Sequence, residues 1–565
     1  MTNNRAMKGS DITIKCLENE GVETLFAYPG GFSIELHQSL QKSNIRVILP
    51  RHEQGGAFAA CGYARATGKV GACMATSGPG ATNLLTGIAD AYMDSTPLVC
   101  ITGQVPSYLI GKNVFQEVDI VGMTRPIIKH SCLVLSAKDL PRIIKEAFHI
   151  ASSGRPGPVL VDIPKNVQQE MCEVDFNPKL KLKTYKSHFD FTADEIKKLK
   201  EMILASKSPC IYAGGGIISA EASDDLLKFA EAYNMPVVTT LMGVGGFPEN
   251  HPLSLKWLGM HGTVYGNNAA NECDLLLAFG ARFDDRVTGD PKTFAVDSKI
   301  IHIDIDKSEI NKNKIADLAI VADIKEVLQE LNKKPIYQDY SAWHKQINDW
   351  KEEFPLTYKE KLGTIQPQYV IEKLYEMTEG EAIIVPGVGQ HQMWAAQYYT
   401  YTLPRQLLTS GGLGAMGFGL PVAMGAKVAL PDKLIVNVDG DGGFQMNIQE
   451  LATLHAEEIN IKMIIINNQH LGLVAQWEDR FYEGIRGNTV LKNKRVERPY
   501  PDFVTIARGY SIPGREVYKR EELESAIKEM LETEGPFLLD IHTGYDEHVL
   551  PMIPSGKDYK SIINK

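Results

Sequence analysis

Residues 440–468, GDGGFQMNIQELATLHAEEINIKMIIINN, decide the fold class of this chain. They follow an apolar run, residues 434–438, which is typical of a buried parallel strand. A strand that ends in Gly-Asp-Gly places the Asp441 carboxylate in the crevice where open α/β sheets bind ligands. The motif therefore predicts a site for a hard cation at the end of a parallel sheet.

The rest of the stretch completes a βαβ unit. Residues 447–457 carry apolar side chains at helical spacing, and residues 462–466 form a second apolar run that ends in Asn467-Asn468. Because consecutive strands of a βαβ unit are usually neighbours, the two amide side chains should return beside Asp441. Carboxylate, amide and phosphate oxygens together would suit Mg²⁺.

Two other interpretations compete for this motif. Gly-Asp-Gly alone is more often a tight turn with a solvated carboxylate. Asp439, Asp441 and Glu450 also fall at positions 1, 3 and 12 of a calcium-binding loop. That loop requires glycine at position 6, where Phe444 stands, and a helix rather than a strand before it. The strand-helix-strand context and the double Asn favour a phosphate and Mg²⁺ site.

Length and composition bound the class of protein. A chain of 565 residues is expected to form three or four domains. The net charge of −10 argues against a nucleic-acid partner, and eight cysteines without a CxxC pair indicate reduced thiols. No apolar run reaches the ~20 residues of a membrane span, and residues 1–11 are too short and too polar for a signal or transit peptide. We therefore expect a cytoplasmic protein, or an organellar one if a leader has been removed.

A second candidate site lies near the N-terminus. An apolar run leads into Pro29-Gly30, and another, residues 45–49, leads to Glu53 before a helix of small residues, 57–67. A carboxylate at the start of a helix is most often explained by the helix dipole alone. Glu53 is therefore a candidate only if another feature of the chain supports it.

Two of these segments resemble those of thiamine-diphosphate (ThDP) enzymes. Gly-Asp-Gly, 24 further residues and Asn-Asn resemble the diphosphate-binding motif, and residues 51–68, RHEQGGAFAACGYARATG, resemble the aminopyrimidine-binding segment. The resemblance implies that Glu53 hydrogen-bonds to N1′ of the aminopyrimidine and favours its reactive tautomer. It also implies that Asp441, Asn468 and the backbone carbonyl of His470 hold Mg²⁺.

The whole chain, in order, resembles the biosynthetic acetohydroxyacid synthases, the FAD-containing acetolactate synthases. Residues 282–289, RFDDRVTG, distinguish the biosynthetic from the catabolic acetolactate synthases, because the catabolic enzymes lack this FAD signature. A surface ion-pair cluster is the simpler explanation of these charged residues. The resemblance implies a structural FAD in the second domain, since the carboligation involves no net electron transfer.

The resemblance implies two sets of cofactor-binding residues. Those for ThDP and its Mg²⁺ are Pro29, Gly30, Glu53, Gln116, Gln390, His391, Gly414, Met416, Asp441, Gly442, Gly443, Asn468, His470, Gly472 and Leu473. Those for FAD and its surroundings are Arg155, Gly215, Thr240, Leu241, Leu258, Met260, His261, Gly280, Arg282, Asp284, Asp304, Ile305, Asp323, Gly411 and Gly412.

It also implies a set of catalytic residues, which are Glu53, Phe115, Gln116, Lys165, Met416 and Trp477. Phe115 and Gln116 would line the substrate pocket, and Lys165 would lie near its entrance together with Lys129. Met416 would bend ThDP, and Trp477 would favour 2-ketobutyrate over pyruvate as the second substrate. Taken singly, such residues are more often core aromatics, a core Met and solvated lysines.

We therefore expect an α/β protein with three doubly wound parallel-sheet domains. They are residues 1–178 for the ThDP pyrimidine, 192–340 for FAD and 362–550 for the diphosphate and Mg²⁺, followed by a tail, 551–565. The resemblance implies a transferase that decarboxylates pyruvate and joins it to a second 2-keto acid. The products would be 2-acetolactate or 2-aceto-2-hydroxybutyrate, for branched-chain amino-acid biosynthesis.

The resemblance also implies partners. Since Glu53 and Asp441 fall on different domains, one cofactor must bridge them, and the family does this across a dimer interface. We expect a homodimer or tetramer with a regulatory small subunit, and no nucleic acid or membrane partner. A sister ThDP enzyme, such as a pyruvate oxidase or decarboxylase, would lack RFDDRVTG and Trp477. A catalytically silent relative should have lost Glu53, Asp441 or Asn468, and all three are present.

Three departures from the family pattern are visible. Phe32 stands where the plant members carry Ala, and Gly443 stands where Ser is frequent. Residues 483–494 follow no pattern of the family. The larger Phe32 is expected to narrow the channel for substrates or inhibitors.

Overall fold

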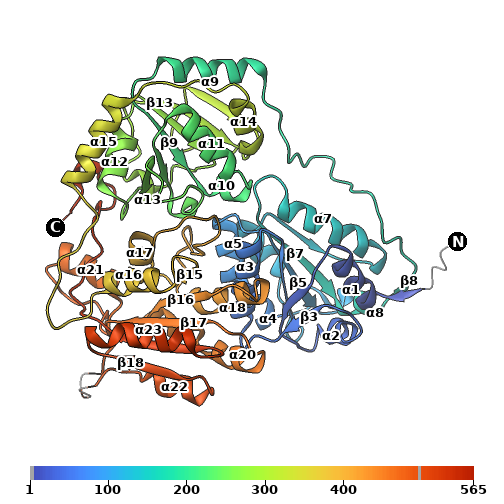
Figure 1. Ribbon diagram of the computed structural model, residues 1–565. Helices are drawn as coiled ribbons and strands as arrows, with labels where there is room; N and C mark the ends of the chain where they lie inside the picture. Colours follow the sequence, from blue (N-terminus) through green and yellow to red (C-terminus); the bar gives the residue numbers. More distant parts are fainter. Residues whose placement is uncertain (1–5, 494, 496–497, 565) are drawn as a thin grey trace.

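The computed structural model describes residues 6–493, 495 and 498–564, which form three α/β domains (Figure 1). In this view the middle domain lies at the top, the first domain at the right and the third domain at the lower left. Each domain has one main sheet, and all strands of these sheets are parallel. The predicted fold class is confirmed. Residues 1–5 of the predicted first domain, residue 494 of the segment that follows no family pattern and residue 565 of the predicted tail lie outside the described residues.

The first domain has the strand order β3-β2-β4-β5-β7-β6. Alternate residues of a strand enter opposite cores, as Met74 and Cys73 of β4 do. Its strands are β2 (Thr24–Ala27), β3 (Arg46–Ile48), β4 (Gly71–Ala75), β5 (Leu98–Gln104), β6 (His130–Leu133) and β7 (Pro158–Pro164). Its helices are α1 (Gly9–Asn19), α2 (Ile34–Leu40), α3 (Glu53–Thr67), α4 (Pro79–Asn83), α5 (Leu85–Met93), α6 (Ile120–Thr124), α7 (Leu140–Ser152) and α8 (Lys165–Gln169). A separate antiparallel pair joins β1 (Met7–Lys8) to β8 (Met171–Cys172).

The middle domain has the strand order β11-β10-β9-β12-β13-β14. Its strands are β9 (Pro209–Ala213), β10 (Val237–Thr239), β11 (Ser254–Trp257), β12 (Leu275–Phe279), β13 (Lys299–Asp304) and β14 (Leu318–Val321). Its helices are α9 (Ala193–Ala205), α10 (Gly215–Ser219), α11 (Ser223–Tyr233), α12 (Val264–Glu272), α13 (Asp285–Thr288), α14 (Ile324–Asn332) and α15 (Ser341–Glu353). α15 packs on this domain, because Trp343 is buried in its core and donates a hydrogen bond to the Pro209 carbonyl (3.0 Å).

The third domain has the strand order β15-β16-β17-β19-β18. Its strands are β15 (Ile383–Pro386), β16 (Ile435–Gly440), β17 (Lys462–Asn467), β18 (Gly514–Val517) and β19 (Phe537–His542). Its helices are α16 (Pro367–Met377), α17 (Gln390–Tyr398), α18 (Gly419–Ala429), α19 (Asp441–Phe444), α20 (Leu451–Ala456), α21 (Gly472–Phe481), α22 (Phe503–Gly509) and α23 (Leu523–Glu532). β16 and β17 are neighbours, as the predicted βαβ unit requires.

The helix predicted at residues 447–457 is wrong in its first turn. Residues 445–450 form 3₁₀ turns interrupted at Asn447 (φ −134°), and the α-helix begins only at Leu451. The Asn447 side chain donates a hydrogen bond to the Gly417 carbonyl (2.7 Å), a long-range contact that replaces regular helix geometry. The contact fixes the segment after Asp441 against the turn that contains Met416.

Two helices of small residues join the first and third domains. A Cβ on Gly62 of α3 would lie 2.2 Å from the Val422 carbonyl oxygen of α18. A Cβ on Gly425 of α18 would lie 1.8 Å from the Ala59 carbonyl oxygen of α3. Any larger residue at either glycine must therefore push the two helices apart.

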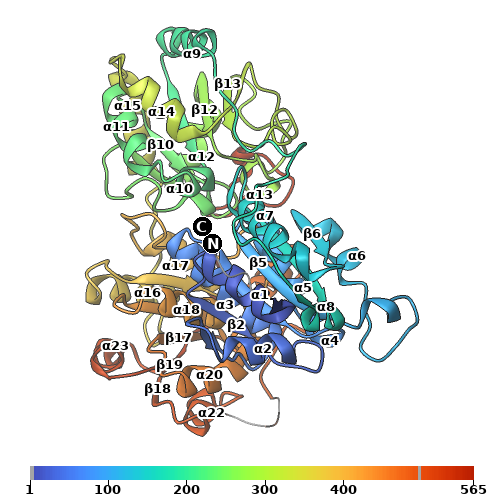
Figure 2. The same cartoon turned by 90° about the vertical axis from the view of Figure 1, so that its right-hand side faces the viewer.

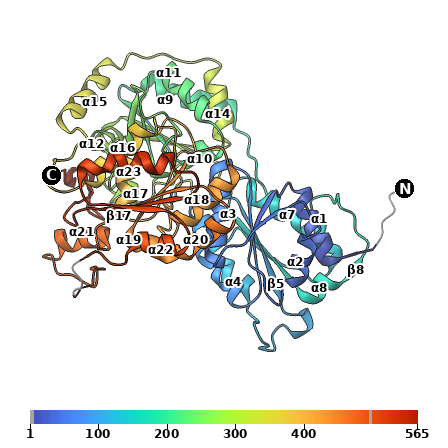
Figure 3. The same ribbon diagram turned by 60° about the horizontal axis from the view of Figure 1, so that its bottom comes forward.

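The segment between β5 and α6 projects from the first domain. In Figure 2 it extends away from the body of this domain, and Figure 3 shows the same projection from below. The C-terminal tail returns to the middle domain, where the Ile553 N–H donates to the Met260 carbonyl (2.8 Å). Across the described residues, no helix is both long enough and apolar enough to span a membrane.

Candidate active site

The third sheet ends at a small cavity of about 90 Å³ around Asp441. Asp441 is the first residue of α19, directly after β16, and is 2% exposed. Its Oδ1 accepts the Gly442 N–H (3.1 Å), and its Oδ2 has no hydrogen-bond partner among the described residues. Burial raises the pKa of this carboxyl to about 8. A buried carboxylate with an unpartnered oxygen fits a bound cation, because the positive charge of the cation would compensate the negative charge of the carboxylate.

Asn468 and His470 line the same cavity from the end of the neighbouring strand β17. Asn468 accepts the His470 N–H at Oδ1 (3.0 Å) and donates to Gln390 Oε1 (3.2 Å). The structure thus brings the three predicted metal ligands together. Other predicted ThDP residues in the lining are Gln390, His391, Met416, Gly442, Gly443, Gly472 and Leu473.

His391 gives this cavity a neutral polar wall. It follows Gln390 at the start of α17, and its Nε2 has no hydrogen-bond partner among the described residues. Burial lowers the pKa of its imidazole to about 3, so the ring is neutral near pH 7. A neutral imidazole can still give one hydrogen bond to a phosphate oxygen, which fits the predicted role.

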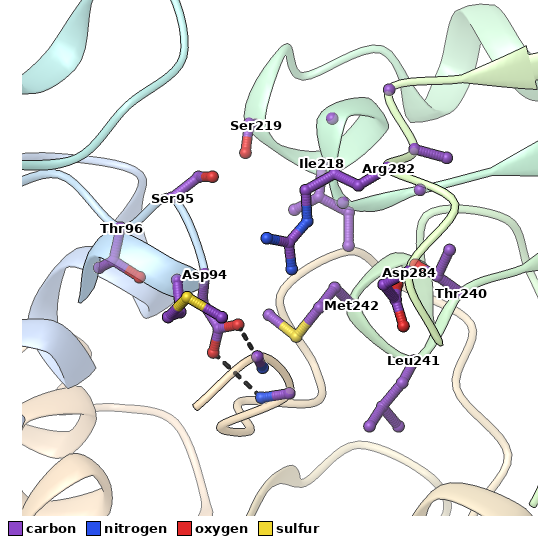
Figure 4. Close-up of a pocket in the computed structure, with 18 of the residues that line it drawn as sticks. Asp94, Ser95, Thr96, Ile218, Ser219, Thr240, Leu241, Met242, Arg282 and Asp284 are labelled. Atoms are coloured by element: carbon purple, nitrogen blue, oxygen red, sulfur yellow. Dashed lines mark hydrogen bonds between the residues drawn. The ribbon is translucent and has the colours of Figure 1, made fainter. Parts of the chain in front are cut away.

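A second cavity of about 900 Å³ lies where the three domains meet (Figure 4). Its wall contains Asp94 from the first domain, Arg282 and Asp284 from the middle domain, and Gly412 from the third. Figure 4 shows the Arg282 side chain extending into it. All fifteen residues predicted for FAD and its surroundings lie in this wall: Arg155, Gly215, Thr240, Leu241, Leu258, Met260, His261, Gly280, Arg282, Asp284, Asp304, Ile305, Asp323, Gly411 and Gly412. Gly414, predicted for ThDP, lies here as well.

Two glycine turns form the narrow part of this wall. A Cβ on Gly214 would lie 2.1 Å from the Gly280 carbonyl oxygen, and Gly280 has φ +57°. Only glycine allows the end of β9 and the end of β12 to approach so closely. Arg155 donates to Glu309 Oε1 (2.6 Å) and Asp306 Oδ2 (3.2 Å), so its charge is already paired. The size and charges of the cavity fit a dinucleotide such as FAD.

Carboxylates of the first domain hold the third-domain wall of this cavity. Asp94 accepts the N–H groups of Gly411 (3.0 Å) and Gly412 (2.7 Å), drawn as dashed lines in Figure 4. Arg65 donates to Asp94 (3.1 Å) and to Asp90 (2.7 Å). We call Arg65, Asp90 and Asp94 the interdomain clamp. The sequence does not predict the clamp, because no local motif connects α3 and α5 to a turn more than 300 residues away.

The predicted residues of the first domain gather at the end of its own sheet. Glu53 begins α3 and accepts a hydrogen bond from Asn83 Nδ2 (2.9 Å). Gln116 has φ +58°, and a Cβ on Gly78 would lie 2.9 Å from its carbonyl oxygen. Lys165 donates to the Gly31 carbonyl (3.1 Å). Asn83 is a further residue of this set, one that the sequence did not predict.

This first-domain set does not line either described cavity. Glu53, Gln116 and Lys165 are absent from both walls, as are Pro29 and Gly30. Phe115, on the projecting segment, is 80% exposed. Tyr108 (68%) and Ile110 (38%) on the same segment are exposed as well, and such a group of exposed apolar side chains is a candidate contact surface for another molecule. The single chain therefore completes the third-domain site but leaves the first-domain set open.

Trp477 and Lys129, two further predicted residues of the substrate pocket, lie in different parts of the molecule. Trp477 is half-buried, lines the large cavity and contacts the Phe481 ring (5.1 Å between centroids). Lys129 lies beside Pro158 at the start of β7 and donates to the Ser153 carbonyl (2.6 Å). Lys165 follows the other end of β7, so the structure separates the two lysines that the sequence analysis placed together.

Three domain families of thiamine pyrophosphate (TPP) enzymes match the chain in order. They are the N-terminal TPP binding domain (residues 7–123), the central domain (196–331) and the C-terminal TPP binding domain (387–541). The chain is therefore a thiamine pyrophosphate enzyme in its domain composition. Over 98% of its length it is 55% identical to acetolactate synthase 1, chloroplastic, of Oryza sativa subsp. japonica, of which it covers 88%. It belongs to the acetolactate synthase family.

Two further relatives lead to the same family. The chain is 52% identical over 99% of its length to acetolactate synthase 1, chloroplastic, of Nicotiana tabacum and covers 85% of that protein. It is also 52% identical over 99% of its length to acetolactate synthase, chloroplastic, of Arabidopsis thaliana and covers 84% of that protein. These names contradict the expectation of a cytoplasmic protein, because all three relatives are chloroplast proteins.

Proposed function

We propose that this chain is an acetolactate synthase, which decarboxylates pyruvate and joins the remaining two-carbon unit to a second 2-keto acid. With pyruvate as acceptor the product is 2-acetolactate, and with 2-ketobutyrate it is 2-aceto-2-hydroxybutyrate. These products place the reaction in the synthesis of branched-chain amino acids. The strongest single support is the match of all three domains to relatives of this name at more than 50% identity.

The third-domain cavity would hold the diphosphate of ThDP through Mg²⁺. Asp441, Asn468 and the His470 carbonyl would be the metal ligands, and Gln390 and His391 would give hydrogen bonds to phosphate oxygens. Both side-chain N–H groups of Gln390 are already donated, to Gln476 Oε1 (3.0 Å) and to the Glu547 carbonyl (2.9 Å), so its backbone N–H at the start of α17 would be the donor to phosphate. When bound, ThDP supplies an electron sink for the loss of CO₂ from a 2-keto acid.

Glu53 would hold a proton between its carboxyl group and N1′ of the aminopyrimidine. Its hydrogen bond from Asn83 fixes the orientation of the carboxylate before the cofactor arrives. Because the first-domain set is open in one chain, we propose a homodimer in which Glu53 of one chain serves the Asp441 cavity of the other. Phe115, Gln116 and Lys165 would complete the substrate pocket in the dimer, and two dimers could associate further.

The large cavity would hold FAD as a structural cofactor. Residues of the glycine turn at Gly280 and of the wall held by the interdomain clamp would hold it. Trp477 and Leu473 line this cavity on the side of the Asp441 site, and Leu473 lines both. Trp477 would therefore be placed to select the second substrate. A regulatory small subunit is a further expected partner, which co-purification would detect.

The test is product analysis under nitrogen. Purified protein receives pyruvate, ThDP, Mg²⁺ and FAD, with 2-ketobutyrate added in a parallel reaction. We expect acetolactate in the first reaction and mainly acetohydroxybutyrate in the second. Acetaldehyde or acetate instead would assign a sister ThDP activity, and Trp477→Leu should reduce the preference for 2-ketobutyrate by roughly tenfold or more.

A further inference from the structure

A cluster of three possible metal ligands lies on the third sheet, outside both described cavities. Glu516 belongs to the edge strand β18, and Asp540 and His542 belong to the neighbouring strand β19. Glu516 and Asp540 are paired in register, and His542 follows two residues later, so all three side chains project from the same face. One ligand atom from each lies within 4.8 Å of the others.

The His542 ring is held in a fixed orientation. It stacks on the Tyr518 ring with 4.2 Å between centroids and 9° between planes. The Tyr518 hydroxyl in turn donates to Glu516 Oε1 (2.9 Å). His542 Nε2 therefore points between two carboxylates, 3.6 Å from Asp540 Oδ2 and 3.7 Å from Glu516 Oε1.

Among the described residues, no hydrogen bond joins His542 Nε2 to either carboxylate. Both separations exceed the length of a hydrogen bond, and His542 Nε2 has no partner among the described residues. The His542 side chain is only 11% exposed and that of Asp540 only 1%. Asp540 Oδ1 accepts from Asn467 Nδ2 (2.9 Å), which turns Oδ2 toward the imidazole. An unpartnered buried imidazole nitrogen that faces two carboxylates is costly unless a ligand occupies the gap.

We propose that Glu516, Asp540 and His542 form a binding site for a divalent transition metal such as Zn²⁺. One imidazole nitrogen and carboxylate oxygens are ordinary ligands for this ion, at about 2.0–2.2 Å from the metal. Tetrahedral ligands at that distance lie about 3.4 Å apart, so the observed separations need little adjustment. Mg²⁺ fits less well, because it prefers an all-oxygen shell.

The site has an entrance and a consequence for the fold. The Glu516 side chain is 39% exposed, which leaves a coordination position open to water on its side. Because the ligands come from two strands, a bound ion would tie the edge strand β18 to β19. It would thereby stabilise the edge of the third sheet independently of ThDP.

The test is a titration of the full chain with Zn²⁺, followed by isothermal calorimetry and by thermal unfolding. ThDP and excess Mg²⁺ are kept constant, so that the Asp441 cavity is filled. We expect one saturable Zn²⁺ site and a rise in Tm with Zn²⁺. His542→Asn and Glu516→Gln should each weaken Zn²⁺ binding at least tenfold and abolish the rise in Tm.

Two control variants separate this site from the proposed catalytic one. His455→Asn removes an exposed histidine of the same domain and should bind Zn²⁺ as the parent chain does. Asp441→Asn removes the predicted Mg²⁺ ligand and should leave Zn²⁺ binding intact even if activity is lost. The proposal is overturned if Zn²⁺ does not saturate a site, if Glu516→Gln binds it normally, or if only Asp441→Asn loses it. Glu516 is exposed, so its substitution tests the site without threatening the fold.

Discussion

The two halves of the proposed ThDP site differ in how much of them one chain completes. The Asp441 half is enclosed, with its ligands on adjacent strands and its Gln390 wall fixed by hydrogen bonds. The Glu53 half is open, and its Phe115 is 80% exposed. An enclosed site can bind its ligand before two chains assemble, whereas an open site requires the surface of a partner chain to complete it. Binding of the diphosphate and activation of the cofactor should therefore be separable by mutation.

The largest effect is expected for Glu53→Gln. Loss of the carboxyl proton should reduce kcat by about 10²- to 10⁴-fold, the usual contribution of a general acid or base. The enclosed half remains intact, so the affinity for ThDP with Mg²⁺ should change little. Steady-state kinetics and calorimetry measure the two effects separately. Glu521→Gln, at an exposed position, is the matched control. A variant with unchanged kcat would remove Glu53 from the mechanism.

Phe115→Ala tests whether the open half is covered in the assembled enzyme. If a partner chain buries this ring, its loss should cost about 1.5–3 kcal/mol, or roughly 10- to 100-fold in kcat/KM for pyruvate. FAD content should stay unchanged, because Phe115 does not line that cavity. Leu135→Ala, another exposed apolar position of the first domain (69%), serves as the control. Equal kinetics for the two variants would mean that Phe115 stays solvent-exposed.

The interdomain clamp should act on the large cavity alone. Asp94→Asn weakens charge-assisted hydrogen bonds to two backbone N–H groups, each worth about 1.5–3 kcal/mol. We expect FAD affinity to fall about tenfold, since part of this loss is absorbed by relaxation of the turn. Quenching of flavin fluorescence measures the affinity, and Asp432→Asn is an exposed control. Normal FAD binding with reduced ThDP binding would contradict the assignment of the wall.

An effect on stability rather than on cofactor binding is expected at the contact between the middle and third domains. Glu249 is buried there and accepts the Tyr401 N–H (2.9 Å), and burial raises its pKa from 4.5 to about 7. The folded state therefore holds an extra proton between these values, so this group's contribution to stability is lost as the pH rises through 7. Glu249→Gln should remove that slope, by roughly 1–3 kcal/mol between pH 5 and 8. Urea unfolding at pH 5 and pH 8 measures this difference in the free energy of unfolding. The same pH dependence in the parent chain and in Glu249→Gln would refute the raised pKa of Glu249.

Much of the site could be predicted because its residues belong to local motifs. Asp441 and Asn468 end adjacent strands of one βαβ unit, so their proximity follows from topology. The FAD wall follows the ends of strands β9, β12 and β13, where open sheets bind ligands. The resemblance to a known family supplied what topology alone does not contain, including the role of Glu53.

The remaining features depend on tertiary contacts that leave no local pattern. Asp94 looks like an ordinary acidic residue after α5, and only the docking of the third domain gives it two N–H groups to hold. Lys129 and Lys165 both resemble pocket lysines, yet they lie at opposite ends of β7. Asn447 fits a helical pattern but bonds instead to Gly417. In each case a contact between distant segments outweighs the local preference.

The contact between α3 and α18 has a reciprocal form. Gly62 faces the carbonyl of Val422, and Gly425 faces the carbonyl of Ala59, which is three residues before Gly62 just as Val422 is three before Gly425. Each helix thus presents the same patch to the other, as in an isologous interface between two copies of one subunit. At this contact the first and third domains therefore meet as two subunits of a symmetric dimer do.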